Sequence, residues 1–312
     1  MLKRLLFLFC CIAICCSGCT FQTNQKNIVK LGYMLNITHA TPIVGIEKEF
    51  FLKSLGDEVS LVSHHFIVGN NIIDAFITDK IDIAYIGPGP FINAVYRGVP
   101  VKFVENAANG GTVIVGNKDG LSANKKLKIA IPQYGNTQDL ILRGYLEDRM
   151  INNVNVFVIP PQEVSTAFYT KSVDATCVPE PWGTVLTNEA MLKILEDEMS
   201  VFNNGNYPVT ILIASKKFCN EYPEIIEKFK LGHEMANKYI NENKCEAIIL
   251  TQKHISQMTK KEIKRSVVEK AFNRCFFVND LDKDILKQFV RIGVNVGYYK
   301  DDLLKNFDQY FN

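Results

Sequence analysis

The chain has 312 residues, of which 35 are basic and 33 are acidic, and 47% of the residues are hydrophobic. A sequence of this length and apolar content is long enough to bury two separate cores. The near balance of charge gives no electrostatic support to a nucleic-acid partner, so we expect none.

The first residues resemble a bacterial secretory signal followed by a lipid-attachment site. Lys3 and Arg4 precede the apolar run 5–16, and Ser17 and Gly18 stand directly before Cys19. The apolar run is too short to cross a membrane as a helix. We therefore expect residues 1–18 to be a cleaved signal peptide and Cys19 to carry lipid that anchors the protein at the extracytoplasmic face of the membrane. An ordinary cleaved signal and an uncleaved anchor are the alternatives.

Loss of the signal peptide changes the composition. It removes two basic residues and leaves equal numbers of basic and acidic side chains. Residues 19–27 are short and polar, which is typical of a tether between lipid and domain. Five of the nine cysteines lie in the first 19 residues, and the four others are Cys177, Cys219, Cys245 and Cys275. The simplest interpretation of these four is that they are free thiols, with disulfides as the alternative.

Strand-like and helix-like segments alternate from residue 28 to residue 215. Predicted strands are 28–34, 58–66, 81–87, 99–106, 111–117, 127–133, 155–160, 173–181 and 208–215, and predicted helices are 38–55, 71–78, one that opens after Pro88, 137–150 and 163–171. After residue 215 the sequence becomes helical, with Pro223 suited to a first helical turn. This alternation predicts an α/β protein with parallel sheets covered by helices.

The segments divide into two blocks, which we expect to form two lobes. The first lobe comprises 28–108 and 208–312, and the second comprises 109–207. The chain then crosses between the lobes near 106–111 and near 206–210, and a ligand is expected in the cleft between them.

Four loops follow a predicted strand and lead into a predicted helix: 36–42, 86–90, 133–139 and 179–183. Helix N-termini present unpaired N–H groups and a partial positive charge, so such loops suit an anion. The fourth loop also places the only tryptophan, Trp182, beside Glu180. Any α/β protein needs helix caps, however, so these polar residues also have a purely structural interpretation. No histidine spacing typical of a metal site and no nucleophile–base pair is present, so we expect no metal, no cofactor and no catalytic residue.

Five segments, in this order, resemble the nitrate/sulfonate/taurine-type binding proteins of ABC importers: LGYMLNITHATPIVGIEKEFF, IDIAYIGPGPFINAVYRG, NGGTVIVGN, IPQYGNTQD and VPEPWGTVL. GNTQD and EPWGT are more similar to the aliphatic-sulfonate branch. The resemblance implies two Rossmann-like lobes of a type II periplasmic binding protein, joined by a two-strand hinge. It also implies a monomer that delivers a small organic anion to the permease subunits of an importer. The anion it favours is an aliphatic sulfonate or taurine.

The same resemblance implies ligand contacts from all four loops and from the hinge, at Asn36, Thr38, His39, Gly87, Pro88, Asn109, Gly110, Gly111, Gly135, Asn136, Thr137, Glu180 and Trp182. Glu180 suggests a ligand that carries an amine, as taurine does. No arginine that holds a sulfonate is identified, because Arg97 and Arg143, the nearest candidates, are expected on outer helix turns.

Several alternatives remain open at this point. Within transport they are a binding protein for nitrate or bicarbonate and one for a thiamine-precursor pyrimidine. Outside it they are an enzyme of the pyrimidine-synthase type, which shares the fold, and an adhesive surface lipoprotein without a ligand cleft.

Overall fold

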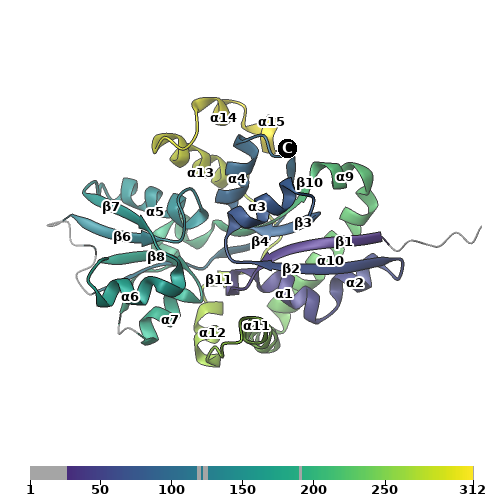
Figure 1. Cartoon of the computed structure of the whole chain (residues 1–312), viewed down its shortest axis with the longest axis horizontal. Coiled ribbons are helices and arrows are strands. Elements are labelled where there is room, and N and C mark those ends of the chain that lie inside the picture. Colours follow the sequence, from purple (N-terminus) through teal and green to yellow (C-terminus); the bar gives the residue numbers. More distant parts are fainter. Residues whose placement is uncertain (1–26, 118–120, 122–125, 190–191, 312) are drawn as a thin grey trace, which may run out of the picture.

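The computed structural model describes residues 27–117, 121, 126–189 and 192–311. The predicted signal peptide, Cys19 and the tether as far as residue 26 lie outside the described residues. Within the described part, no helix has both the length and the apolar character needed to cross a membrane. The described chain forms two α/β lobes, each built on one sheet (Figure 1).

We call the six-stranded sheet and its helices lobe 1. Its strands lie in the order β11-β4-β10-β3-β1-β2. Their bounds are β1 (Asn27–Met34), β2 (Val59–Phe66), β3 (Ile83–Ile86), β4 (Val101–Gly110), β10 (Pro208–Ser215) and β11 (Cys275–Phe276). The helices are α1 (Ala40–Glu47), α2 (Phe50–Leu55), α3 (Gly69–Ile77), α4 (Pro88–Tyr96), α9 (Lys216–Glu221), α10 (Pro223–Glu242), α11 (Lys244–Thr259) and α12 (Arg265–Phe272).

We call the five-stranded sheet and its helices lobe 2. Its strands lie in the order β7-β6-β8-β5-β9. Their bounds are β5 (Thr112–Gly116), β6 (Leu127–Ile131), β7 (Val154–Val158), β8 (Ala175–Pro179) and β9 (Lys193–Glu196). The helices are α5 (Thr137–Asp148), α6 (Val164–Tyr169), α7 (Trp182–Glu189) and α8 (Glu198–Val201).

Both sheets are mixed, which corrects the expectation of parallel sheets. In lobe 1, β1 pairs in parallel with β2 and β3, but β10 runs antiparallel to both β3 and β4. In lobe 2, β5 runs antiparallel to β8. The antiparallel strands β10 and β5 are those by which the chain enters each sheet from the other lobe, so they arrive from the opposite direction.

Successive side chains along the central strands of lobe 1 face two different apolar cores in turn. Ala84 and Ile86 of β3 face the core that contains α3 and α4. Ile83 and Tyr85 face the core that contains α1, α2, α10, α11 and α12. This period of two is expected for a strand covered by helices on both faces, because successive side chains point to opposite faces.

The predicted helix 38–55 is broken into two. α1 ends at Glu47 and α2 begins at Phe50, because Glu49 adopts a left-handed backbone conformation with φ of 57°. The break lets α2 pack along α10, where the Phe51 and Phe229 rings stack with centroids 4.4 Å apart.

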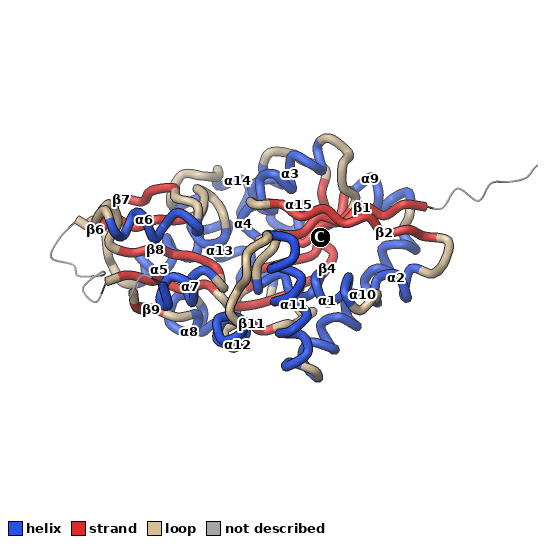
Figure 2. Tube along the Cα trace, turned by 60° about the horizontal axis from the view of Figure 1, so that its bottom comes forward, coloured by secondary structure: helices blue, strands red, loops and turns tan. Residues whose placement is uncertain are grey.

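The C-terminal helices lie across both lobes. α13 (Lys283–Asn295) packs against α5 of lobe 2 and α4 of lobe 1 (Figure 2). It is followed by α14 (Asp301–Lys305) and α15 (Phe307–Phe311), and Phe311 contacts the Phe91 ring of α4. One apolar cluster therefore runs from lobe 1 through α13 into lobe 2.

Candidate functional site

The four predicted loops all lie at carboxyl ends of strands that face the other lobe. Asn36 follows β1, Gly87 follows β3, Gly135 follows β6 and Glu180 follows β8. The chain connects the lobes through two short segments, 110–112 and 206–208, which we call the connecting segments. In open α/β sheets ligands bind outside the carboxyl ends of the strands, so this edge is the candidate site.

The second and third loops meet directly across the gap between the lobes. The Gly89 N–H donates to Thr137 Oγ1 at 3.2 Å, and Asn93 Nδ2 donates to the Gly135 carbonyl oxygen at 2.8 Å. A Cβ on Gly89 would lie 2.5 Å from the carbonyl carbon of Asn136. We call the contact of Gly89 and Asn93 with residues 135–137 the interlobe seam. Only glycine permits so close an approach of two backbones.

The third loop is shaped by Asp139, which is fully buried. Asp139 accepts hydrogen bonds from the Gly135 N–H at 2.8 Å and from the Tyr298 hydroxyl at 2.6 Å, and Arg143 Nε lies 3.0 Å from it. Arg143 therefore stabilises the loop, in place of the outer position expected for it. Asn136 Oδ1 caps α5 by accepting from the Asp139 N–H, and Thr137 is the first helical residue. Capping thus belongs to Asn136, which leaves the Thr137 hydroxyl to the seam.

The first loop supplies a buried neutral donor. Asn36 Oδ1 accepts from the Thr38 hydroxyl at 2.8 Å and from the His39 N–H at 3.2 Å, which fixes the turn after β1. His39 Nδ1 accepts from the Met34 N–H at 3.3 Å, so the neutral ring carries its proton on Nε2. Burial lowers the pKa of His39 to about 3, and Nε2 makes no hydrogen bond to the described residues. A free N–H donor is thus present beside the first loop.

Thr38 brings the first loop to a connecting segment. A Cβ on Gly111 would lie 3.1 Å from Thr38 Cγ2, and the backbone of Gly111 has a φ of 71°. The Gly111 carbonyl in turn accepts from the Glu180 N–H at 2.8 Å. The first and fourth loops therefore meet at Gly111, while the second and third meet at the seam.

Glu180 is fully buried, and its carboxylate already has internal partners. It accepts from the Thr184 N–H and hydroxyl, both at 3.0 Å, and lies 2.9 Å from Arg274 Nη1. Burial raises the pKa of Glu180, while Thr184 and Arg274 act to lower it. Trp182 begins α7, is partly buried, and packs against an apolar cluster that lies entirely within lobe 2. The expectation that Glu180 receives an amine of the ligand thus finds no free carboxylate oxygen.

Arg274 was missed by the sequence analysis. It lies between α12 and β11 in lobe 1, and it forms ion pairs with Glu180 and with Glu198 of α8, the latter at 3.5 Å. Both carboxylates belong to lobe 2, so Arg274 ties the two lobes together. The only sequence signal is one charged residue between apolar ones in AFNRCFF. Its partners are too distant in sequence to be found.

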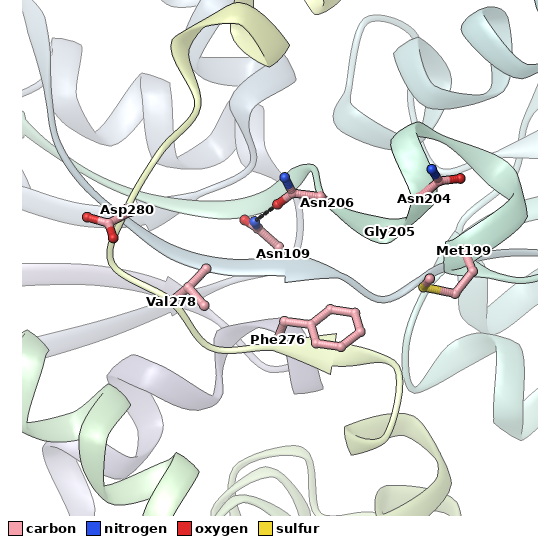
Figure 3. A pocket seen from close by; sticks show the side chains of 8 residues that line it. All are labelled: Asn109, Met199, Asn204, Gly205, Asn206, Phe276, Val278 and Asp280. Carbon is pink, nitrogen blue, oxygen red and sulfur yellow. Dashed lines mark hydrogen bonds between the residues drawn. The ribbon is translucent and has the colours of Figure 1, made fainter.

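Asn109 and Gly110 lie at a separate pocket of about 490 Å³ (Figure 3): Asn109 lines it, and a Cβ on Gly110 would lie 3.1 Å from Cδ2 of Phe276, which also lines it. Asn109 Nδ2 donates to Asn206 Oδ1 at 3.0 Å, so the end of β4 is joined there to the second connecting segment. The pocket is lined by Asn109, Met199, Asn204, Gly205, Asn206, Phe276, Val278 and Asp280, and we call it the β11-side pocket. In the strand order β11-β4-β10-β3-β1-β2, the β11-side pocket lies on the β11 side of β4. Gly87 and Asn36 follow β3 and β1, which lie on the other side of β10.

The described cysteines are free thiols, and Cys177 and Cys275 are buried. Among the described residues, no group of three histidine, cysteine or acidic side chains is arranged to hold a metal ion.

The model of the NMT1-like family matches residues 22–252, which is most of the sequence. The chain belongs to this family. One curated relative is the bicarbonate transport ATP-binding protein CmpC of Synechococcus elongatus, with 24% identity over 223 residues. The alignment covers 64% of the present chain and 33% of CmpC, so the chain spans about a third of that relative's length.

Solved structures share the fold at low identity. The periplasmic nitrate-binding protein NrtA of Synechocystis PCC 6803 superposes with a TM-score of 0.76 at 14% identity, covering 91% of this chain and 86% of NrtA. The periplasmic aliphatic sulphonate binding protein SsuA of Escherichia coli superposes with a TM-score of 0.73 at 15% identity, covering 88% of each chain. The predicted two-lobed periplasmic-binding-protein fold is thereby confirmed.

Proposed function

We propose that the chain is the substrate-binding lipoprotein of an ABC importer and that it holds a small organic anion between its lobes. The observation that carries this proposal is the interlobe seam, where helix-entry loops of both lobes meet at Gly89 and Thr137. Supporting this, the relatives and structural neighbours are by name transport or binding proteins for bicarbonate, nitrate and sulfonates.

The anion is held by neutral donors. Arg143 and Arg274 contact the third and fourth loops, but they are already paired there with Asp139 and Glu180. The donors that remain are the His39 Nε2–H, the N-terminus of α5 at Thr137, and its hydroxyl. Hydrogen bonds from N–H groups and a helix dipole stabilise a negative charge without a counterion.

An alkanesulfonate without an amine fits better than taurine. The sequence argument for an amine depended on Glu180, and the oxygens of that carboxylate are bound by Thr184 and Arg274. A ligand ammonium would have to displace Arg274 from a buried position, and removing one partner of such a pair costs about 3–5 kcal/mol. Nitrate and bicarbonate remain the competing ligands because the relatives carry those names.

Lipid on Cys19 completes the proposal, with the mature protein at the extracytoplasmic face of the membrane and permease subunits as its partners. Intact-mass analysis of membrane-extracted protein tests the anchor. An N-terminus other than an acylated Cys19 contradicts it.

The ligand is tested by thermal shift and calorimetry on the full chain with ethanesulfonate, taurine, nitrate, bicarbonate and an aminopyrimidine. We expect ethanesulfonate to stabilise the protein most among these compounds. A ligand present at 100 times its Kd adds about 2.7 kcal/mol to the free energy of unfolding. Binding of the pyrimidine alone favours the thiamine-precursor alternative. Binding of no member of the panel contradicts the proposal.

A further inference from the structure

The β11-side pocket is open and partly apolar. Its volume of about 490 Å³ lies in the range of small-molecule sites. Three large apolar side chains line it although they are well exposed to solvent: Met199 (51%), Phe276 (42%) and Val278 (37%). In Figure 3, Phe276 lies between Val278 and Met199. Apolar side chains grouped in an open hollow mark a binding surface more often than scattered ones do.

The polar lining of this pocket is amide and acid. Asp280 is the one charged side chain that lines it, and the other polar side chains are Asn109, Asn204 and Asn206. None of the described residues that line the pocket is basic, so the lining favours a cation over an anion.

The walls of the pocket belong to both lobes. Met199 and the segment 204–206 come from lobe 2, while Asn109 and Phe276 come from β4 and β11 of lobe 1. Val278 and Asp280 lie on the segment that leads to α13 (Figure 3). A molecule in the pocket therefore touches both lobes at once, on the side of the connecting segments opposite to the seam.

We propose that the β11-side pocket binds a small amphipathic cation, that is, an ammonium group carried on an aromatic or aliphatic body. The ammonium lies near the Asp280 carboxylate, where charge attraction acts on it. The body packs against Val278, which lies between Asp280 and Phe276 in Figure 3, and against the Phe276 ring. Because the cation contacts both lobes, it stabilises the conformation in which Gly89 meets Thr137.

The test is a calorimetric titration of benzyltrimethylammonium into the full chain in a neutral detergent, without any anion that binds the seam. We expect saturable binding of one cation per chain. Asp280→Asn and Phe276→Ala each weaken it by roughly threefold to fivefold, because both side chains are partly exposed. Asp284→Asn is the matched control, since it removes the same charge four residues away on the exposed start of α13.

Three results would overturn the assignment: no binding to the wild type, an equal loss in the Asp284 control, or equally tight binding of uncharged benzyl alcohol. The bridging of the lobes has its own test. Gly89→Ala holds the seam apart and is far from the pocket, so it should weaken cation binding by roughly twofold or more, and unchanged affinity contradicts bridging. Neither readout involves the anion, so failure here is distinguishable from failure of the proposed transport function.

Discussion

The lobes meet differently on the two sides of the β4–β10 pair. On the β3 side, Gly89 and Thr137 are in hydrogen-bonding contact, and the nearby arginines are neutralised by buried acids. On the β11 side, the lobes leave an open pocket in which Asp280 is the charged lining group. Both sides are bordered by the same two connecting segments. We expect a rotation about these segments that separates the seam to narrow the pocket.

This difference also shows how charge is distributed at an interface between lobes. In our two proposals, the buried side offers N–H donors to an anion, whereas the exposed side offers a carboxylate and apolar surface to a cation. A chain that is nearly neutral as a whole would then have two local preferences of opposite sign.

The largest expected effect concerns the interlobe ion pair. Arg274→Met leaves the buried Glu180 carboxylate without its cation and should lower the free energy of unfolding by about 3 kcal/mol. Arg265→Met, at the start of the preceding helix α12, is the control, because its pair with Glu269 is exposed and contributes about 1 kcal/mol at most. Urea unfolding followed by circular dichroism measures both. Equal, small losses would show that Arg274 does not tie the lobes together.

The next effect concerns the seam itself. Gly89→Ala places a methyl group 2.5 Å from the backbone of Asn136, so the lobes cannot close fully. We expect a larger radius of gyration in small-angle scattering and a loss of anion affinity of about tenfold, or 1.4 kcal/mol. An unchanged melting temperature would show that each lobe still folds. Wild-type affinity with this variant would mean that the seam plays no part in binding.

A smaller effect concerns pH. Burial raises the pKa of Glu198 from 4.5 to about 7. The folded protein therefore binds more protons than the unfolded one between these values, and stability falls as pH rises from about 4.5 to about 7, then levels off. Glu198→Gln should flatten this fall by an amount on the order of 1 kcal/mol. Unfolding curves at pH 5 and pH 8 measure the change, and a slope identical to that of the wild type counts against a buried, protonated Glu198.

The smallest effect concerns the second hydrogen bond of the seam. Asn93→Ala removes the bond from Asn93 Nδ2 to the Gly135 carbonyl and should weaken anion binding by a few-fold, since one such bond contributes about 1 kcal/mol. Asn71→Ala, on the exposed face of α3, is the control. If the two variants bind alike, the seam depends on Gly89 and Thr137 alone.

Local patterns predicted much of the fold. The fully buried run of β10 and the capping residue Asn136 were readable because apolar periodicity and helix caps are encoded within a few residues. Strands β9 and β11 have four and two residues, too few for a recognisable pattern, and were missed. The antiparallel direction of β10 was missed as well, because pairing between distant strands leaves no local trace.

The positions of the four loops could be predicted from the sequence, whereas their contacts with a ligand remain predictions. Glycines and helix-entry residues identified the four loops, including Gly87 and Thr137. The role of Glu180 depended on Arg274, which lies 94 positions further along the chain. No spacing rule connects such a pair, so the internal partner of Glu180 could not be predicted from the sequence.

The most direct test of the account is a calorimetric titration of ethanesulfonate into the wild type and Thr137→Val, with thermal melting of both. The Thr137 hydroxyl accepts from Gly89 at the seam and is placed at the N-terminus of α5, while Asn136 does the capping. We predict that Thr137→Val lowers affinity at least tenfold, consistent with about 1.5–3 kcal/mol for a hydrogen bond to a charged group, and leaves the melting temperature nearly unchanged. Unchanged affinity with a lowered melting temperature would contradict an anion site at the seam.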